Sequence, residues 1–207
     1  MLNNAYAQIM QPQEDAQRSG RIQGLRYAEV IRIEEEGHIL QWLSGNVATE
    51  SAPARVASFM AGKERGAFFA PEVGDEVVVG FEEGDLDSPV ILGALWSDVD
   101  APPTQADTSE DNNIRTIVSR MGHEITFDDT QGEGKVLIKT KAGLQALMED
   151  KDSKVTIKVD DSNMIEITNT GITLLAGTTL TLKVNDSNKI EISASGVTVS
   201  GQTINLN

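Results

Sequence analysis

The chain lacks cysteine altogether among its 207 residues, which excludes disulfides, thiolate metal sites and cysteine nucleophiles. It has only two histidines, His38 and His123, and aromatic residues make up 4% of the sequence. No stretch approaches the roughly 18 consecutive apolar residues that cross a membrane. The first residues also lack the basic start and apolar core of a signal peptide, so we expect no export by that route.

Basic side chains are scarce relative to acidic ones. Lys and Arg number 17 against 32 Asp and Glu, which gives a formal net charge of -15. A nucleic-acid-binding protein needs cations for the phosphates, and an anionic membrane surface attracts cations too, so the charge argues against both partners. The first 103 residues carry 7 basic and 17 acidic groups, net -10. The simplest role of this excess is to keep the protein soluble.

Proline and aromatic residues are missing from most of the second half. All six prolines lie at or before Pro103, and no Phe, Trp or Tyr follows Phe127. The polar run after Pro102 and Pro103 is typical of a linker. We therefore predict an N-terminal arm or short helix over 1–19, a compact domain over 20–103, a linker over 104–113 and a second domain over 114–207.

Short β-branched runs dominate the first half. Strands are indicated at about 22–33, 39–47, 75–81 and 90–96, because each run is rich in Val, Ile or Leu and bounded by Gly, Asp or Pro. Several short strands with tight turns between them predict a small barrel or sandwich.

The second half alternates apolar and polar residues with period two, as in residues 154–159 and 179–184. Residues 161–168 reappear 25 positions later as 186–193, and the match continues to Gly177, aligned with Gly201 after a one-residue deletion. We predict that the aliphatic residues of these strands form a core: Val155, Ile157, Ile165, Ile167, Leu180, Leu182, Ile190 and Ile192.

Three architectures fit this alternation. Three identical chains winding together would form a thin prism, because aliphatic side chains would meet on a narrow axis and the open strand edges would be paired. A single-chain β-solenoid has a similar repeat. A plain antiparallel meander, with a hairpin turning at Asn169-Thr170-Gly171, also accounts for it.

Residues 70–96 read APEVGDEVVVGFEEGDLDSPVILGALW. This segment closely resembles the OB-fold of contractile-tail spikes, the family of phage baseplate assembly protein V and VgrG-like central spikes. The family pattern is P-x-x-G-[DE]-x-V-x-V-x-F-x-x-G-D-x-[DS]-x-P-V-[IV]-x-G-x-[LV]-[WY], and the chain follows it nearly throughout. Trp96 is expected to plug the barrel or its junction with the next chain. The motif positions are Pro71, Gly74, Asp75, Gly84, Asp85, Pro89, Gly93 and Trp96.

The resemblance implies an all-β protein with a small OB-fold barrel followed by an intertwined trimeric β-helix, the needle. It implies a structural central spike of a phage tail, or of another contractile injection machine, which punctures the target cell envelope without catalysis. Such a spike assembles in the bacterial cytoplasm into a virion or particle baseplate and touches the envelope transiently. The implied partners are two further copies, a hub protein on the N-terminal side and a PAAR-type tip protein. The tip contacts would be Ile204, Asn205, Leu206 and Asn207.

The chain departs from the family pattern in three places, and each departure excludes a feature that some relatives have. The ten linker residues leave no room for the lysozyme domain of some relatives, and 19 residues before the barrel leave none for a hub domain. The His-x-His motif that binds iron at some needle tips is missing near Asn207.

No catalytic, cofactor or metal site is expected. His38 is interpreted as a solvated turn residue and His123 as a structural residue at the start of the needle. The neighbouring carboxylates Asp128–Asp129 and Glu82–Glu83 point to opposite faces of a strand. The alternative function, a carbohydrate- or cell-surface-binding β-solenoid module, needs exposed aromatics for sugar stacking, and residues 128–207 have none.

Overall fold

A computed structural model describes residues 22–43, 50–107 and 109–204. These residues form an all-β protein, which confirms the predicted fold class, and the part described contains no α-helix and no helix long and apolar enough to cross a membrane. One 3-10 turn, η1, spans Glu82–Gly84. The strands are β1 Arg26–Ile33, β2 His38–Trp42, β3 Arg55–Val56, β4 Ala61–Gly62, β5 Arg65–Gly66, β6 Glu76–Phe81, β7 Pro89–Ala94, β8 Ile114–Val118, β9 Glu124–Asp128, β10 Lys135–Lys139, β11 Gln145–Glu149, β12 Lys154–Asp160, β13 Asn163–Thr168, β14 Gly171–Leu175, β15 Thr179–Asn185, β16 Asn188–Ser193 and β17 Gly196–Ser200.

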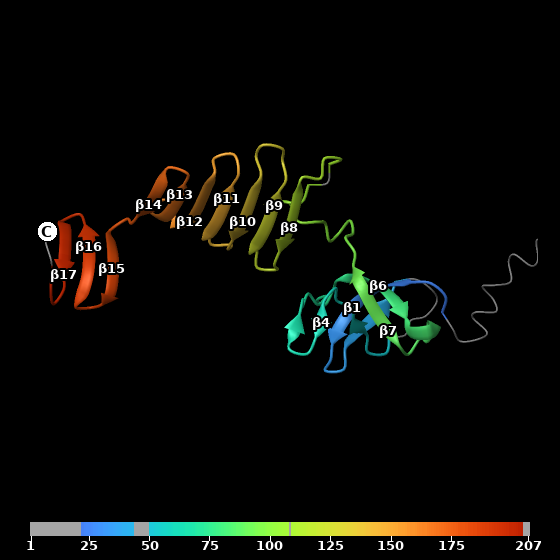
Figure 1. The fold of residues 1–207 in the computed structure, drawn as a ribbon. Helices are drawn as coiled ribbons and strands as arrows, with labels where there is room; N and C mark the ends of the chain where they lie inside the picture. The colour runs from blue at the N-terminus through green and yellow to red at the C-terminus, as the bar shows by residue number, and fades with distance from the viewer. Residues whose placement is uncertain (1–21, 44–49, 108, 205–207) are drawn as a thin grey trace, which may run out of the picture. The chain divides into compact units, whose positions relative to one another are not determined.

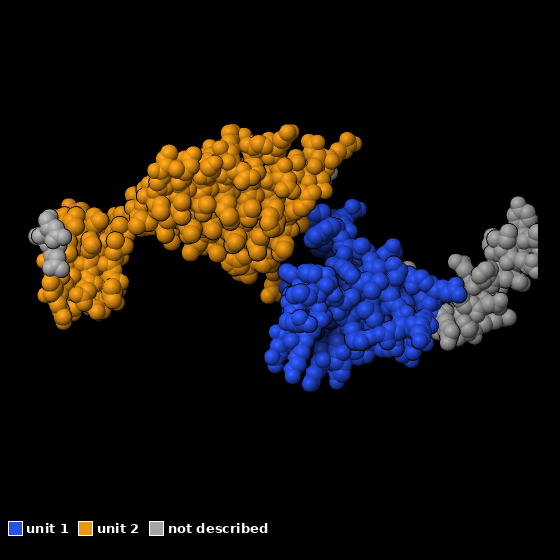
Figure 2. Space-filling model, viewed as in Figure 1, with its two compact units in different colours: residues 1–102 blue, residues 103–207 orange. Residues whose placement is uncertain are grey.

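The chain divides into two compact units, residues 1–102 and 103–207 (Figure 2). The first unit, which contains β1, β6 and β7 (Figure 1), is built on a five-stranded sheet in the order β2-β1-β6-β7-β3. All neighbours are antiparallel except β3 and β7, which run parallel. The sheet is a half-barrel consistent with an OB-fold.

Alternation along the strands builds the barrel core. In β1, Ala28 and Val30 are fully buried while Tyr27 and Glu29 between them face outward, as the period-two geometry of a strand requires. Trp42 closes one side of the core against Phe81, with ring centroids 5.6 Å apart. The core consists of Ala28, Val30, Leu40, Trp42, Ala54, Val77, Val79 and Ile91.

Two predicted strand boundaries were wrong. β1 begins at Arg26 and not at residue 22, because Gly24 adopts a φ of +91° that breaks the extended backbone just before it. β2 ends at Trp42, whereas the prediction ran to residue 47. Residues 44–49 and the predicted arm over 1–19 lie outside the described residues.

The prediction that His38 is a solvated turn residue was also wrong. His38 is the first residue of β2 and is buried. Its backbone pairs with Ala54 in both directions, and its Nε2 lies 3.1 Å from the carbonyl oxygen of Pro71. The ring therefore ties β2 to the segment that precedes β6.

The second unit is an antiparallel meander in two sheets. Strands β8 to β14 form a seven-stranded sheet in sequence order, and β15, β16 and β17 form a separate three-stranded sheet. Every strand pairs antiparallel with its sequence neighbour within its sheet. Within one chain the described strands thus form the predicted meander, with the hairpin between β13 and β14, and the single-chain solenoid is wrong.

The sequence repeat is a structural repeat with a constant offset of 25 residues. β12, β13 and β14 recur as β15, β16 and β17, and the pairs Val155↔Ile167 and Leu180↔Ile192 occupy equivalent places. The amide side-chain oxygen of Asn163 accepts from Gly177 N (3.1 Å), and that of Asn188 accepts from Gln202 N (3.4 Å). Gly177 is therefore equivalent to Gln202, and the deletion placed before Gly201 by sequence alignment was wrong.

Candidate functional site: an apolar sheet face

Two rows of apolar side chains cross one face of the seven-stranded sheet. They result from strand alternation combined with a register that sets apolar residues directly opposite one another. The first row is Ile117, Ile125, Ile138, Ala146, Ile157, Ile165 and Leu174. The second row is Phe127, Val136, Met148, Val155, Ile167 and Ile172. We call these two rows the apolar face.

The apolar face is only half covered in a single chain. Ile157, in the first row, is 50% exposed, and Ile165 and Ile167 of β13 are 39% and 41% exposed. Its first row lines one continuous apolar hollow that Leu180 and Leu182 of β15 also border. Contiguous exposed apolar surface of this extent marks an interaction site in a water-soluble protein.

The predicted needle-core residues all lie in such rows. Val155, Ile157, Ile165 and Ile167 belong to the apolar face. Leu180 and Leu182 of β15 stand opposite Ile192 and Ile190 of β16, and these pairs continue to Val197 and Val199 of β17. Their burial in an assembly stays a prediction, because in one chain they are partly open to solvent. Of the predicted tip contacts, Ile204 is exposed, and Asn205, Leu206 and Asn207 lie outside the described residues.

The opposite face of the same sheet carries charged and hydroxyl side chains. Lys154 Nζ lies 3.2 Å from Glu149 Oε2, and this hydrogen bond raises the pKa of Lys154. Thr116 and Thr126 share a hydroxyl hydrogen bond of 2.7 Å. The two faces of one sheet therefore differ in chemistry, although Arg115 extends the second apolar row onto β8 and Leu137 and Leu147 interrupt the polar row of the opposite face.

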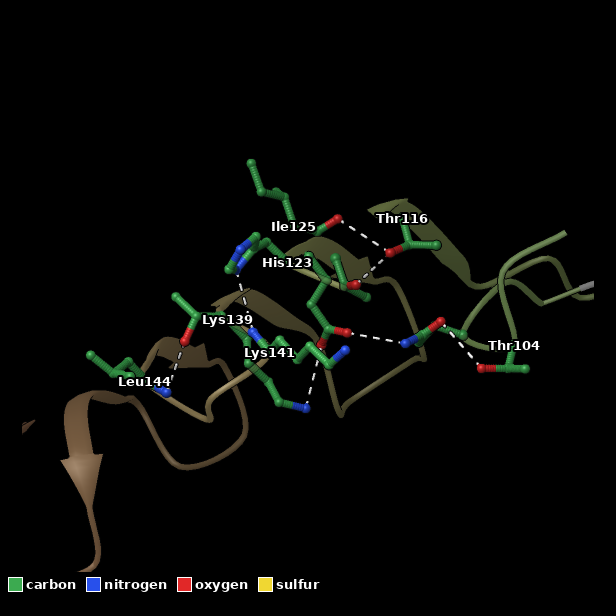
Figure 3. Close-up of polar contacts among 11 residues, drawn as sticks. Thr104, Thr116, His123, Ile125, Lys139, Lys141 and Leu144 are labelled. Atoms are coloured by element: carbon green, nitrogen blue, oxygen red, sulfur yellow. Dashed lines mark hydrogen bonds and ion pairs between the residues drawn. The ribbon is translucent and has the colours of Figure 1, made fainter. Parts of the chain in front are cut away.

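A polar cluster lies where the second unit begins (Figure 3). Glu124, on the charged face of β9, is 7% exposed. Gln105 donates from Nε2 to its Oε2 (3.1 Å), and Lys139 Nζ lies 3.8 Å from its Oε1. The cluster fastens the predicted linker to β9 and β10 and compensates a buried carboxylate, which is a structural role.

His123 immediately precedes β9 (Figure 3), and strand alternation sets it on the same side as Ile125 and opposite Glu124. The backbone N–H of Lys141 donates to its Nδ1 (3.3 Å), so Nδ1 is an acceptor and Nε2 carries the proton in the neutral ring. A metal ligand at Nε2 would need the opposite tautomer. Among the described residues no three His, Cys, Asp or Glu side chains are grouped to hold a metal ion.

The motif residues of the barrel shape its turns. Gly74 (φ +99°) and the Asp75 carboxylate, which accepts from Glu72 N (2.8 Å), form the turn before β6. Gly84 (φ +81°) and Asp85, which accepts from Asp87 N (3.1 Å), form the turn between β6 and β7. Trp96 is 67% exposed, so it does not plug the barrel, and its contact with a neighbouring chain stays a prediction. Pro71 and Pro89 are buried, and Gly93 is exposed on β7.

Sequence reasoning missed an exposed aromatic cluster on the barrel. Phe59, Phe68 and Phe69 flank the β4–β5 hairpin, and Phe68 is 91% exposed. The signal was present in the sequence, because three of the nine aromatic residues of the chain fall within eleven positions around a Gly-Lys-Glu-Arg-Gly turn.

The repeated turn after β12 gives a pH prediction with an internal control. The Asp160 carboxylate accepts from Ser162 N (2.8 Å) and Asn163 Nδ2 (2.9 Å), and these bonds hold its pKa below the ordinary 3.8. The equivalent Asn185 makes the same bonds to Ser187 and Asn188 without a titratable group. A lowered folded pKa means that the contribution is complete above the ordinary value and is lost as pH falls through the folded value.

We therefore expect the Ser162 amide resonance to move further in an NMR titration below pH 3.8 than the Ser187 amide does. The Asp160→Asn variant should keep the turn and reduce the movement of the Ser162 resonance to that of Ser187. A Ser187 resonance that titrates like that of Ser162 would contradict the assignment.

Comparison with known proteins finds similarity that includes the barrel. Residues 31–96 match the family described as the Type VI secretion system/phage-baseplate injector OB domain. The chain is 30% identical over 107 residues to the type VI secretion system spike protein VgrG3 of Vibrio cholerae serotype O1, which covers 49% of this chain and 10% of that protein. It is 28% identical over 116 residues to the spike protein VgrG5 of Pseudomonas aeruginosa, covering 54% and 15%.

A third relative is the actin cross-linking toxin VgrG1 of Vibrio cholerae serotype O1, 26% identical over 133 residues, or 58% of this chain and 12% of the toxin. The aligned part thus spans 10% to 15% of the length of these relatives. The matches confirm the resemblance to baseplate protein V and VgrG-like spikes seen in the sequence.

Proposed function

We propose that this chain is a structural component of the central spike of a phage baseplate or related contractile injection machine. Its apolar face is the observation that carries the proposal. Ten of the thirteen apolar side chains in the two rows are 39% to 68% exposed in one chain, and the repeat β15–β17 extends the same pattern. Only association brings such a face out of water, and the burial of apolar surface is the main driving force for association.

The proposed assembly is a homotrimer, in which three apolar faces meet on one axis and form a needle. Aliphatic side chains suit a narrow axis because they are compact, and after Phe127 no aromatic ring needs accommodation. The charged faces, which carry the ion pair of Lys154 with Glu149, would then lie outward. Paired edges and a dry interior would make the needle stiff, which puncturing an envelope by mechanical force requires.

The role is proposed to be mechanical and not catalytic, with the barrel as a collar. Two relatives that support it are spike proteins, although the third is a toxin. A hub protein on the barrel side and a PAAR-type protein at the far end of the needle are proposed as partners on the strength of the family resemblance alone.

The experiment is the mass of the purified protein in native solution. Light scattering should give three times the 22.3 kDa of the chain at micromolar concentration. A mass of one chain would refute both the trimer and the needle.

A further inference from the structure

The β4–β5 hairpin of the barrel combines exposed rings with free positive charge. Phe59, Phe68 and Phe69 stand at its base, and its tip carries Lys63 and Arg65 with the exposed Glu64 between them, which leaves a net charge of +1. Elsewhere in the described barrel the guanidinium groups are engaged: Arg32 pairs with Glu34 and Glu50, Arg55 pairs with Glu82, and Arg26 lies 5.7 Å from the Trp42 ring. Lys63 and Arg65 make no ion pair within the described residues.

A second surface of the barrel has the opposite charge. Leu25 and Tyr27 are exposed beside β6, where a Cβ on Gly80 would lie 3.3 Å from Leu92 Cδ1 and 3.8 Å from Leu25 Cδ2. Ile22 N donates to Gly84 O (2.7 Å), which sets this surface next to the turn after β6. That turn carries the exposed carboxylates Glu82, Glu83, Asp85 and Asp87.

We propose that the basic hairpin of one copy packs on the acidic Leu25–Tyr27 surface of the next copy, so that three barrels close into a ring. This inference rests on the proposed trimer and names the barrel surfaces that hold it together. A threefold axis requires contacts between two different patches of each protomer. The two patches described here match in apolar character and are opposite in charge.

Electrostatics favours this pairing over other contacts between barrels. Each barrel carries a net charge of -10 over residues 1–103, so three copies side by side repel one another. Setting Lys63 and Arg65 against a neighbour's carboxylates is the arrangement that turns the repulsion into attraction at the contact. Opposed charges at an interface also fix its register.

The chain has no native cysteine, so disulfide trapping can test the contact in the full-length protein. The double variant Ala61→Cys/Asp87→Cys places one thiol on each surface, and both positions are exposed. Mild oxidation should give covalent dimers and trimers on a non-reducing gel. The matched control Ala61→Cys/Glu35→Cys moves the second thiol to the exposed β1–β2 turn and should stay monomeric on the gel.

Charge reversal tests the chemistry of the contact. Lys63→Glu/Arg65→Glu in the trapping background should lower the yield of linked species about fivefold at low salt, and Glu83→Lys should restore part of it. Light scattering on the same samples separates the two proposals. A trimer without Ala61–Asp87 links, or links insensitive to charge reversal, would overturn the barrel contact alone, whereas a monomer would overturn the proposed function as well.

Discussion

Leu182→Lys should abolish the trimer, whereas Thr181→Lys should leave it intact. The two residues are adjacent on β15 and point to opposite faces, and both are exposed in a single chain, Leu182 by 51%. A different outcome for the two variants can therefore arise only from assembly. In the needle three ammonium groups would be buried together at position 182, at a cost on the order of several kcal/mol for each ion.

At position 181 the new lysine would stand opposite Glu191, a favourable cross-strand pair. Sedimentation velocity and thermal melting of both variants measure the effect. We expect a single-chain species for Leu182→Lys and a trimer that melts within a few degrees of the parent for Thr181→Lys. Equal losses would mean that Leu182 does not face the interior.

Ile91→Ala should destabilise the barrel by about 2–5 kcal/mol, because it opens a cavity in a packed core. Ile91 is fully buried and pairs with Val79 across β6 and β7. Its neighbour Leu92 is 50% exposed, so Leu92→Ala should cost less than about 1 kcal/mol.

Urea unfolding followed by the fluorescence of the buried Trp42 measures both changes in the full chain. The mass in native buffer serves as a control, because the needle rows lie in the other unit and should hold the trimer together in both variants. A midpoint that moves equally for the two variants would contradict the assignment of Ile91 to the core.

Local patterns in the sequence were sufficient for the strands of the second unit. Apolar residues at every second position predict β-strands, because a strand places them all on one face. A repeat of eight residues at a spacing of 25 predicted that β12–β14 recur as β15–β17. The family segment over residues 70–96 likewise indicated the turns at Gly74 and Gly84, because their positive φ values require glycine.

Other features depend on which strands meet, and no local pattern encodes that. His38 follows a turn and looks solvated, yet pairing with Ala54 and packing against Pro71 bury it. Trp96 looks like a core residue by size, yet it lies beyond the end of β7, where no strand of the described residues covers it. Position relative to the sheet, and not residue type, sets the burial of both.

Three properties could be predicted from the residues alone: the chain is all-β, its barrel resembles an injector OB domain, and aliphatic side chains share one side of each strand after Phe127. These properties follow from the backbone period and from residue types at fixed spacings. The alignment of those side chains into continuous rows across the seven-stranded sheet could not be predicted in this way, since register depends on the pairing of Ile125 with Ile138 and of Ile157 with Ile165 across turns of different lengths. The positions of Lys63 and Glu83 on distinct surfaces of opposite charge also depend on tertiary structure. Lys63 lies in the separate β4–β5 hairpin, whereas Glu83 follows β6 of the five-stranded sheet.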